Sequence, residues 1–243
     1  MPAKTIKAAL KKIKNTPLHP QWLVSRQEEK NLRNICSNLN GLVIDIGCAE
    51  KKPKEHINDQ TIYIGLDYPT TADNWYKTQP NVYGDAQELP LHESCADNVL
   101  LLDVLEHIPS PHLCLQEINR ILKPNGKLWI QVPFMYPIHD APLDFHRWTA
   151  FGFDELAKQH GFSITSKKAN GGLVESASIL MNIAISKTTL NWIKAKNPFA
   201  LFIFLLPAII FTINIIGYLS SLVCRDDPMM PTGYTMTWKK DQQ

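Results

Sequence analysis

The 243 residues suffice for one catalytic domain with appendages, and a formal net charge of +2 is too small to indicate nucleic acid or another polyanionic partner. The five cysteines are odd in number, widely spaced and free of CxxC pairs. This pattern argues against a zinc site and a disulfide framework, so we expect no metal and a reducing, cytoplasmic setting. The N-terminus lacks the continuous apolar core of a secretory signal.

The first fourteen residues carry five lysines and no acidic residue. Ile6, Leu10 and Ile13 fall on one face of a helix drawn through this segment, which predicts a short basic amphipathic helix. It is either a solvated tail or a contact with a membrane surface. Two prolines then break the chain, and the spacing of residues 22–39 predicts a further helix.

From residue 42 onward, short apolar runs alternate with helical segments, a pattern that predicts a mostly parallel sheet with helices on both faces. We therefore expect an α/β, Rossmann-like fold of seven strands with a hydrophobic helical insertion before the last strand. The strands are expected at residues 42–47, 61–67, 81–86, 126–134, 162–168 and 234–240, with a further one starting at residue 98. Helices are expected at residues 111–122, 151–160 and 173–194, and a turn at residues 124–126.

The ends of the first strands carry the first candidate site residues, because ligands of such sheets bind beyond the carboxyl ends of the strands. Gly47 lets the backbone turn sharply and approach a ligand closely, and Asp45 can accept hydrogen bonds from a cationic amine. Cys48 and Ala49 follow Gly47, so the glycine pattern of NAD-binding proteins is missing and a pyrophosphate cradle is not expected.

Acidic residues also end the next three strands. Asp67 lies 22 residues after Asp45, where an acid can accept both ribose hydroxyls of an adenosine; a surface carboxylate that caps the next helix is the alternative. Asp85 follows the third strand, where a carboxylate can accept the exocyclic amine of adenine. Asp103 leads from the fourth strand into a loop.

Together these motifs resemble the type 11 methyltransferase domain of the S-adenosylmethionine (SAM) dependent superfamily. The resemblance covers residues 41–168 and rests on Asp45 to Ala49, Asp67, residues 84–90 (GDAQELP), Asp97 through Leu105-Glu106-His107, and residues 120–126 (RILKPNG). It departs at Ala49, where the family usually has a second glycine. The resemblance implies SAM as cofactor, methyl transfer by in-line displacement, and a cofactor site formed by Asp45, Gly47, Cys48, Ala49, Asp67, Tyr68, Asp85, Ala86 and Asp103.

The loop at residues 133–149 mixes polar and aromatic side chains in a way that suits a hydroxylated or anionic methyl acceptor. It also resembles a stretch of methyltransferases found with polysaccharide and glycolipid pathways. The candidate catalytic residues are His139, Asp144, His146 and Arg147. The alternative is that Asp144 and Arg147 form a structural ion pair at a helix entry. We expect His107 to be a helix-start residue near the cofactor rather than a base.

Residues 197–224 contain no charged side chain and meet the length criterion for a transmembrane helix. A single span would separate the last strand from its sheet, and the run is too short for two full spans. We therefore expect a helical hairpin that breaks near Pro207 and docks on the membrane or is partly immersed. Asn214 and Gly217 weaken a simple spanning helix further. Lysines in residues 4–14, with Lys194 and Lys196, would add attraction to anionic lipid.

These observations predict a basic segment at residues 1–21, a SAM-binding core at residues 22–172, an insertion at residues 173–224 and a closing strand at residues 225–243. The predicted function is methyl transfer to a small, glycan or lipid-linked acceptor, with peripheral contact to the cytoplasmic face of a membrane. A catalytically inactive SAM-fold subunit that regulates a partner is one alternative. For the insertion, a soluble helical cap or dimer interface is another.

Overall fold

The computed structural model describes residues 13–223 and 229–242, so nearly all of the predicted basic helix at residues 1–14 lies outside the described residues. The chain forms two compact units. The first, here called the hairpin unit, comprises Met1–Lys30, Met135–Pro137 and Ala169–Thr232. The second, called the sheet unit, comprises Asn31–Phe134, Ile138–Lys168 and Gly233–Gln243.

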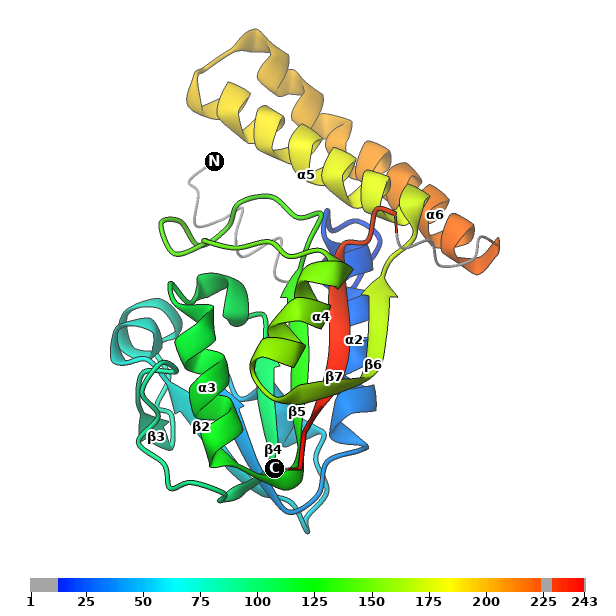
Figure 1. Cartoon of the computed structure of the whole chain (residues 1–243). Coiled ribbons are helices and arrows are strands. Elements are labelled where there is room, and N and C mark those ends of the chain that lie inside the picture. The colour runs from blue at the N-terminus through cyan, green and yellow to red at the C-terminus, as the bar shows by residue number, and fades with distance from the viewer. Residues whose placement is uncertain (1–12, 224–228, 243) are drawn as a thin grey trace. The chain divides into compact units, whose positions relative to one another are not determined.

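A seven-stranded sheet confirms the predicted α/β, Rossmann-like architecture (Figure 1). Its strand order is β3-β2-β1-β4-β5-β7-β6. The strands β1 to β5 pair in parallel with their neighbours, and β7 runs antiparallel to β5. The strands are β1 (Leu42–Ile46), β2 (Ile62–Asp67), β3 (Val82–Tyr83), β4 (Ala96–Leu102), β5 (Leu122–Pro133), β6 (Phe162–Asn170) and β7 (Gly233–Lys240).

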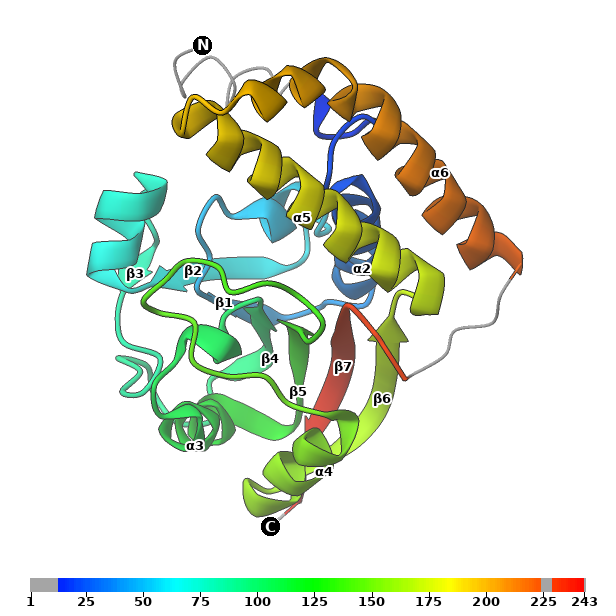
Figure 2. The same cartoon turned by 90° about the horizontal axis from the view of Figure 1, so that it is seen from above.

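Helices cover both faces of this sheet, as expected for parallel strands (Figure 2). Helices α3 (Pro111–Ile121) and α4 (Ala150–Gln159) lie on one face, and the C-terminal part of α2 (Trp22–Cys36) lies on the other. Three short helical turns, η1 (Lys52–Glu55), η2 (Thr71–Tyr76) and η3 (Leu105–His107), lie in the loops that follow β1, β2 and β4. The apolar core includes a cluster in which Ile35 and Cys36 pack against Val43, Leu100 and Trp129.

The start of β5 differs from the sequence prediction. The strand begins at Leu122, and residues 124–126, predicted as a turn, belong to it. The pairing of β5 with β4 shifts register between Ala96 and Asn98, and Asn125 takes a left-handed backbone with φ +64°. A bulge therefore absorbs the Pro-Asn-Gly sequence, which keeps a turn-like backbone inside a longer strand.

The hairpin unit contains the predicted insertion between β6 and β7. Its arms are α5 (Leu173–Lys194) and α6 (Leu206–Val223), which lie side by side and are joined by η4 (Pro198–Phe204) (Figures 1 and 2). The expected break at Pro207 is wrong, because α6 is continuous from Leu206 and places this proline in its first turn, where no backbone N–H is needed. The first arm of the hairpin is therefore α5, and the uncharged run contributes only η4 and the second arm, α6.

Polar and small residues hold the two arms together. The Asn182 Nδ2 donates to Asn214 Oδ1 at 2.9 Å, and both side chains are fully buried. The Asn214 Nδ2 donates in turn to the carbonyl oxygens of Pro17 and His19 at 2.7 and 2.9 Å. At Gly217 a Cβ would lie 2.9 Å from the Ser178 side chain. Asn214 and Gly217, which we expected only to weaken a spanning helix, are thus interhelical contacts.

Candidate functional site

The carboxyl ends of β1 and β2 are joined by backbone hydrogen bonds. The N–H groups of Gly47 and Cys48 both donate to the Leu66 carbonyl, at 2.8 and 3.1 Å. Gly47 has φ +71°, and a Cβ there would lie 2.4 Å from Val104 Cγ2. Glycine is therefore required at this position by its backbone and by a close approach to Val104. The steric contact that we expected with a ligand is made by this neighbouring loop.

Asp67 ends β2 and has a carboxylate held by two backbone donors. The Ala49 N–H donates to Oδ2 and the Tyr68 N–H to Oδ1, both at 2.8 Å. Burial raises the pKa of Asp67, while these two hydrogen bonds lower it. Asp67 is only 2% exposed, unlike a surface residue that caps a helix. Each of its oxygens retains acceptor capacity, because an ionised carboxylate has about four acceptor sites.

Ala49 replaces the usual second glycine and adopts φ +41°, a left-handed backbone that favours glycine. Its N–H still reaches Asp67, so the alanine keeps the loop closed over the end of β2. Tyr68, on the other side of Asp67, leaves 51% of its surface exposed. The structure therefore brings Ala49, Asp67 and Tyr68 together.

Asp45 and Cys48 point into the protein. Asp45 is 3% exposed and accepts a hydrogen bond from the Tyr63 hydroxyl. Burial raises the pKa of Asp45 to about 7. Cys48 is also buried, and a Cβ at Gly65 would lie 2.8 Å from its Sγ. The partner of Asp45 in the structure is thus a tyrosine hydroxyl from β2, where we expected a ligand amine.

Asp85, Ala86 and Asp103 lie in the loops after β3 and β4. Asp85 and Ala86 are half-buried, and Asp85 accepts a hydrogen bond from the Gln87 N–H at 2.8 Å. Asp103 has φ +55° and accepts a hydrogen bond from Gln131 Nε2 at 2.8 Å. Burial raises the pKa of Asp103. Gln131, on β5, is a residue that sequence reasoning missed, because no motif links it to the β4 loop.

Tyr76, at the end of η2, is a second residue that the sequence did not single out. Burial raises the pKa of its hydroxyl, and the carboxylates of Asp140, Asp67, Glu50 and Asp103 raise it further. Tyr76 therefore lies within electrostatic reach of the predicted cofactor acids and of the predicted acceptor loop. The sequence around it offers no motif from which this placement could have been inferred.

Three of the four candidate catalytic residues form one cluster. Arg147 binds Asp144 through two hydrogen bonds of 2.5 and 2.8 Å, so the alternative ion pair before α4 is present. The same carboxylate lies 3.2 Å from His139 Nδ1. The Arg147 hydrogen bond is the main reason that the pKa of Asp144 falls to about 2. His146 is separate, since its ring stacks on Trp148 with centroids 5.0 Å apart.

Glu106 is the most unusual group beside this cluster. Its side chain is 0% exposed, and neither carboxylate oxygen has a hydrogen-bond partner among the residues that the structure describes. Burial raises the pKa of Glu106, and the Asp103 carboxylate raises it further. His107 Nε2 and His139 Nε2 lie 3.7 and 3.8 Å from Oε1. The sequence placed Glu106 in a motif but gave it no role.

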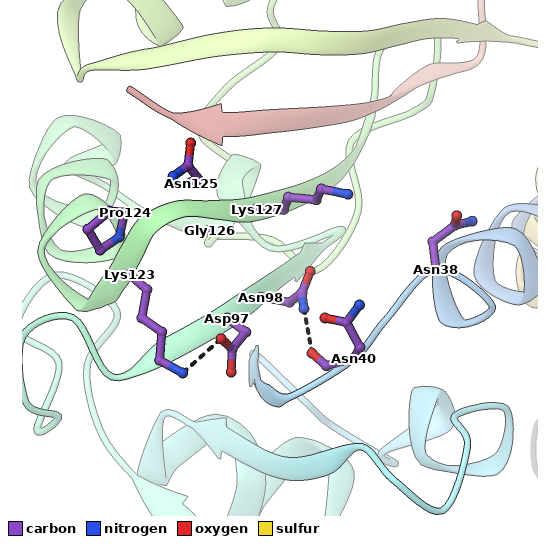
Figure 3. A pocket seen from close by; sticks show the side chains of 9 residues that line it. All are labelled: Asn38, Asn40, Asp97, Asn98, Lys123, Pro124, Asn125, Gly126 and Lys127. Carbon is purple, nitrogen blue, oxygen red and sulfur yellow. Dashed lines mark hydrogen bonds and ion pairs between the residues drawn. The ribbon is translucent and has the colours of Figure 1, made fainter. Parts of the chain in front are cut away.

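A separate depression lies at the amino ends of the strands (Figure 3). Asp97 accepts hydrogen bonds there from the Leu42 N–H at 2.8 Å and from Lys123 Nζ at 2.7 Å. The Asn98 Nδ2 donates to the Asn40 carbonyl at 2.8 Å. These contacts join the starts of β1, β4 and β5, so Asp97, part of the sequence motif, acts structurally at the edge opposite the candidate site.

Part of the sheet unit is similar to known proteins. Residues 44–130 match the family described as "Methyltransferase domain". A protein of Mycolicibacterium smegmatis that carries the name of an S-adenosylmethionine-dependent methyltransferase is 31% identical over 133 residues. The match covers 50% of this chain and 52% of that protein, so the chain spans about half the length of this relative.

Solved structures share the fold at low sequence identity. A SAM-dependent methyltransferase from Thermotoga maritima aligns with a TM-score of 0.55 and 16% identity, over 91% of this chain and 93% of that one. The cyclase SpnF aligns with a TM-score of 0.54 and 14% identity, over 89% of this chain and 81% of that one. A cyclase on the same fold shows that the architecture alone does not determine the reaction, so function depends on the site.

Proposed function

We propose that this chain, which carries a domain of the SAM-dependent methyltransferase superfamily, transfers a methyl group from SAM to an acceptor held beside the cluster of His139, Asp144 and Arg147. The name of the Mycolicibacterium smegmatis relative supports SAM as the methyl donor. When bound, SAM supplies a methyl group on a sulfonium, and its transfer leaves S-adenosylhomocysteine.

The observation that carries the proposal is the geometry of Asp67. Its carboxylate sits at the carboxyl end of β2, is oriented by the N–H groups of Ala49 and Tyr68, and keeps acceptor capacity for two hydroxyls. This is the position at which an acid recognises the ribose of an adenosine ligand in related sheets. We propose that Asp103, in the loop after β4, and Tyr76, whose pKa is raised by burial and by carboxylates that include Asp67 and Asp103, line the same site.

The acceptor loop supports a polar acceptor. The Phe145 N–H donates to the Glu106 carbonyl at 2.9 Å, which anchors the loop on η3 beside the cofactor acids. A fixed loop contributes mainly alignment, which is worth up to about 7–11 kcal/mol in favourable intramolecular models. His139 is oriented by Asp144, which holds its ring beside the proposed acceptor. We propose a hydroxyl on a lipid-linked or saccharide-linked molecule.

The hairpin unit supports lipid as the medium in which this acceptor is found. α6 is the one helix in the described part of the chain that is long and apolar enough to cross a membrane. Large apolar side chains are exposed along η4 and α6, among them Leu201, Phe204 and Val223 at 70%, 80% and 86%. The polar Asn182 and Asn214 are buried between the arms. Polar contacts inside and apolar side chains outside are typical of helices in lipid.

We therefore propose that η4 and α6 dock on a membrane or are partly immersed in it. We propose the cytoplasmic face, because the odd number and wide spacing of the cysteines in the sequence argue against a disulfide framework. Lys194 and Lys196 lie just before η4, where they would attract anionic headgroups.

Thermal denaturation of the full chain with SAM, S-adenosylhomocysteine and NAD side by side tests the cofactor. We expect SAM and S-adenosylhomocysteine to raise the Tm and NAD to leave it unchanged, because only a ligand that binds the folded state stabilises it. A shift with NAD alone would replace the methyltransferase by an oxidoreductase. Incubation with methyl-labelled SAM and a lipid extract should then place the label in the organic phase.

Flotation with vesicles that contain anionic lipid tests the membrane contact. We expect the full chain to float with the vesicles and the Leu201→Asp and Phe204→Asp variants to remain in the aqueous fraction. Phe151→Asp is the matched control, because Phe151 is also 80% exposed but lies on α4 of the sheet unit. Equal flotation of all variants, or none by the full chain, would favour a soluble cap or a dimer interface.

A further inference from the structure

We propose that Glu106, His107 and His139 bind a divalent transition-metal ion. One ligand atom from each of these residues lies within 4.8 Å of the other two. The three residues come from η3 and from the acceptor loop, and all belong to the sheet unit. From the cysteine pattern we expected no metal, but that pattern bears only on thiolate sites.

The buried carboxylate is the first reason. Glu106 has a fully buried side chain, and both of its oxygens lack a hydrogen-bond partner among the described residues. A buried polar group without a partner is costly, and such groups in native proteins call for an explanation such as an ion. A cation bound to Oε1 would neutralise this carboxylate where the protein supplies no N–H donor.

The orientation of the two imidazoles is the second reason. The Nδ1 of His107 lies 2.6 Å from the Leu143 carbonyl oxygen, which can only accept, so the proton of this ring is on Nδ1. The Nδ1 of His139 lies 3.2 Å from Asp144 Oδ2, and Arg147 lies slightly farther from it, at 3.4 Å. The carboxylate is the nearer partner and accepts only, so it places this proton on Nδ1 too.

When both rings are neutral, each Nε2 carries a lone pair that faces Glu106 Oε1, at 3.7 and 3.8 Å. These lone pairs and the carboxylate repel one another unless a proton or a metal cation lies between them. Histidines that ligate metals are held in this manner, with the second ring nitrogen donating to a carbonyl or a carboxylate. Asp144 and Arg147 are on this view positioning residues, since Arg147 fixes Asp144 and Asp144 fixes His139.

The distances between the three ligand atoms fit a metal ion once these atoms move slightly closer together. Bonds of about 2.1 Å to nitrogen and oxygen hold neighbouring ligand atoms roughly 3.0–3.4 Å apart. The side chains of His107 and His139 are 21% and 27% exposed, so an ion can enter and coordination positions remain open. Two imidazoles and one carboxylate suit Mn²⁺, Fe²⁺, Co²⁺ or Zn²⁺ better than Mg²⁺ or Ca²⁺.

An open position on the metal would bind the oxygen of the acceptor and lower the pKa of its hydroxyl. This role rests on the proposed methyl transfer, whereas metal binding itself does not. The two can therefore be tested separately, with the metal alone as the probe and without SAM or acceptor.

Titration of the metal-stripped full chain with Mn²⁺, followed by the electron paramagnetic resonance signal of the free ion, tests the proposal. We expect one bound Mn²⁺ per chain and at least a tenfold loss of affinity in both Glu106→Gln and His139→Ala. Asp144→Asn keeps all three ligands and should weaken binding about 10- to 100-fold by misorienting His139. Circular dichroism and the metal-free Tm would show that each variant is folded.

His112→Ala is the control for adventitious binding, because His112 Nδ1 and His160 Nε2 form another histidine pair, 2.9 Å apart. It should bind Mn²⁺ like the unmodified chain. Absence of Mn²⁺ binding, or equal binding by folded Glu106→Gln, would overturn the proposal. If Mn²⁺ binds but S-adenosylhomocysteine does not, the metal site stands and the proposed function fails.

Discussion

The sheet unit and the hairpin unit differ in where their large apolar side chains lie. In the sheet unit, the central strands bury apolar residues such as Val43, Ile44 and Leu100, all fully inaccessible. In the hairpin unit, Asn182 and Asn214 are fully buried while Phe204 and Val223 are 80% and 86% exposed. Burial of apolar side chains is expected in water. Exposed apolar side chains around buried polar ones are expected when the surroundings are as apolar as the side chains.

The two units therefore differ in what stabilises them. The sheet unit is stabilised by its own apolar core and can therefore hold costly features, such as buried acids and left-handed residues, at its carboxyl edge. The hairpin unit combines buried polar contacts between its arms with an exposed apolar surface, which the proposed membrane contact would cover. Substitutions in the two units should consequently impair the protein for different reasons.

The largest effect is expected at the edge of the sheet unit. Asp67→Ala removes a charged acceptor for two hydroxyls, and hydrogen bonds to charged groups contribute about 1.5–3 kcal/mol each. We expect SAM affinity to fall at least 100-fold in isothermal calorimetry. Asp59→Ala, at an exposed loop position, is the control and should bind normally. Unchanged affinity in Asp67→Ala would remove this residue from the site.

Gly47→Val should destabilise the sheet unit by roughly 3 kcal/mol, because it adds left-handed strain and overpacks against Val104. Replacing Val104 by alanine in the same chain removes only the overpacking. The double variant should therefore recover about half of the lost unfolding free energy in urea denaturation. Full recovery would show that the φ of +71° carries no cost, and no recovery would show that Val104 is not the obstacle.

In the hairpin unit the sensitive position is polar. Asn214→Leu leaves Asn182 and the carbonyls of Pro17 and His19 without their partner, and a stranded buried group costs about 1–3 kcal/mol. We expect a loss of about 2–3 kcal/mol in denaturation of the full chain. Thr212→Leu, on the exposed side of α6, should change little. A stabilised Asn214→Leu would contradict the polar packing and break the contrast between the units.

The buried Asp45 gives the sheet unit a dependence on pH. Its pKa rises from 3.8 to about 7 on folding, so the folded state holds its proton more tightly and this contribution to stability is lost as pH rises through that window. Asp45→Asn has no such proton. Relative to the unmodified chain, it should gain about 2–3 kcal/mol of unfolding free energy between pH 5 and pH 8, at about 1.4 kcal/mol per unit. If the difference in unfolding free energy between the two proteins did not change with pH, Asp45 would be ionised in the folded state over this whole pH range.

The smallest effect is expected at Ala49. Its φ of +41° suits glycine, so Ala49→Gly should relieve strain and raise the unfolding free energy by about 0.5–1 kcal/mol. Because the Ala49 N–H to Asp67 is kept, SAM affinity should not fall. Calorimetry and urea denaturation on the same preparation would check both parts. A loss of stability would show that the loop after β1 is relaxed with alanine.

The strands, the helices and the edge that carries Asp67 and Asp103 could be predicted because they follow from local periodicity and from the rule for parallel sheets. The side chains that contact these residues could not be predicted. Nothing near Asp45 in the sequence indicates Tyr63, and the orientation of Glu106 depends on His139, 33 residues later. The same limit applies to the hairpin, since the uncharged run predicted an insertion but not that α5 would be its first arm.

The central claim is that SAM binds at the carboxyl edge of the sheet, and hydrogen–deuterium exchange with and without S-adenosylhomocysteine tests it most directly. We predict slower exchange of the backbone amides around Ala49, Tyr68 and Asp103, and no change at residues 123–127 beside the depression of Figure 3. Protection confined to residues 123–127, or protection of the carboxyl edge by NAD and not by S-adenosylhomocysteine, would contradict the claim.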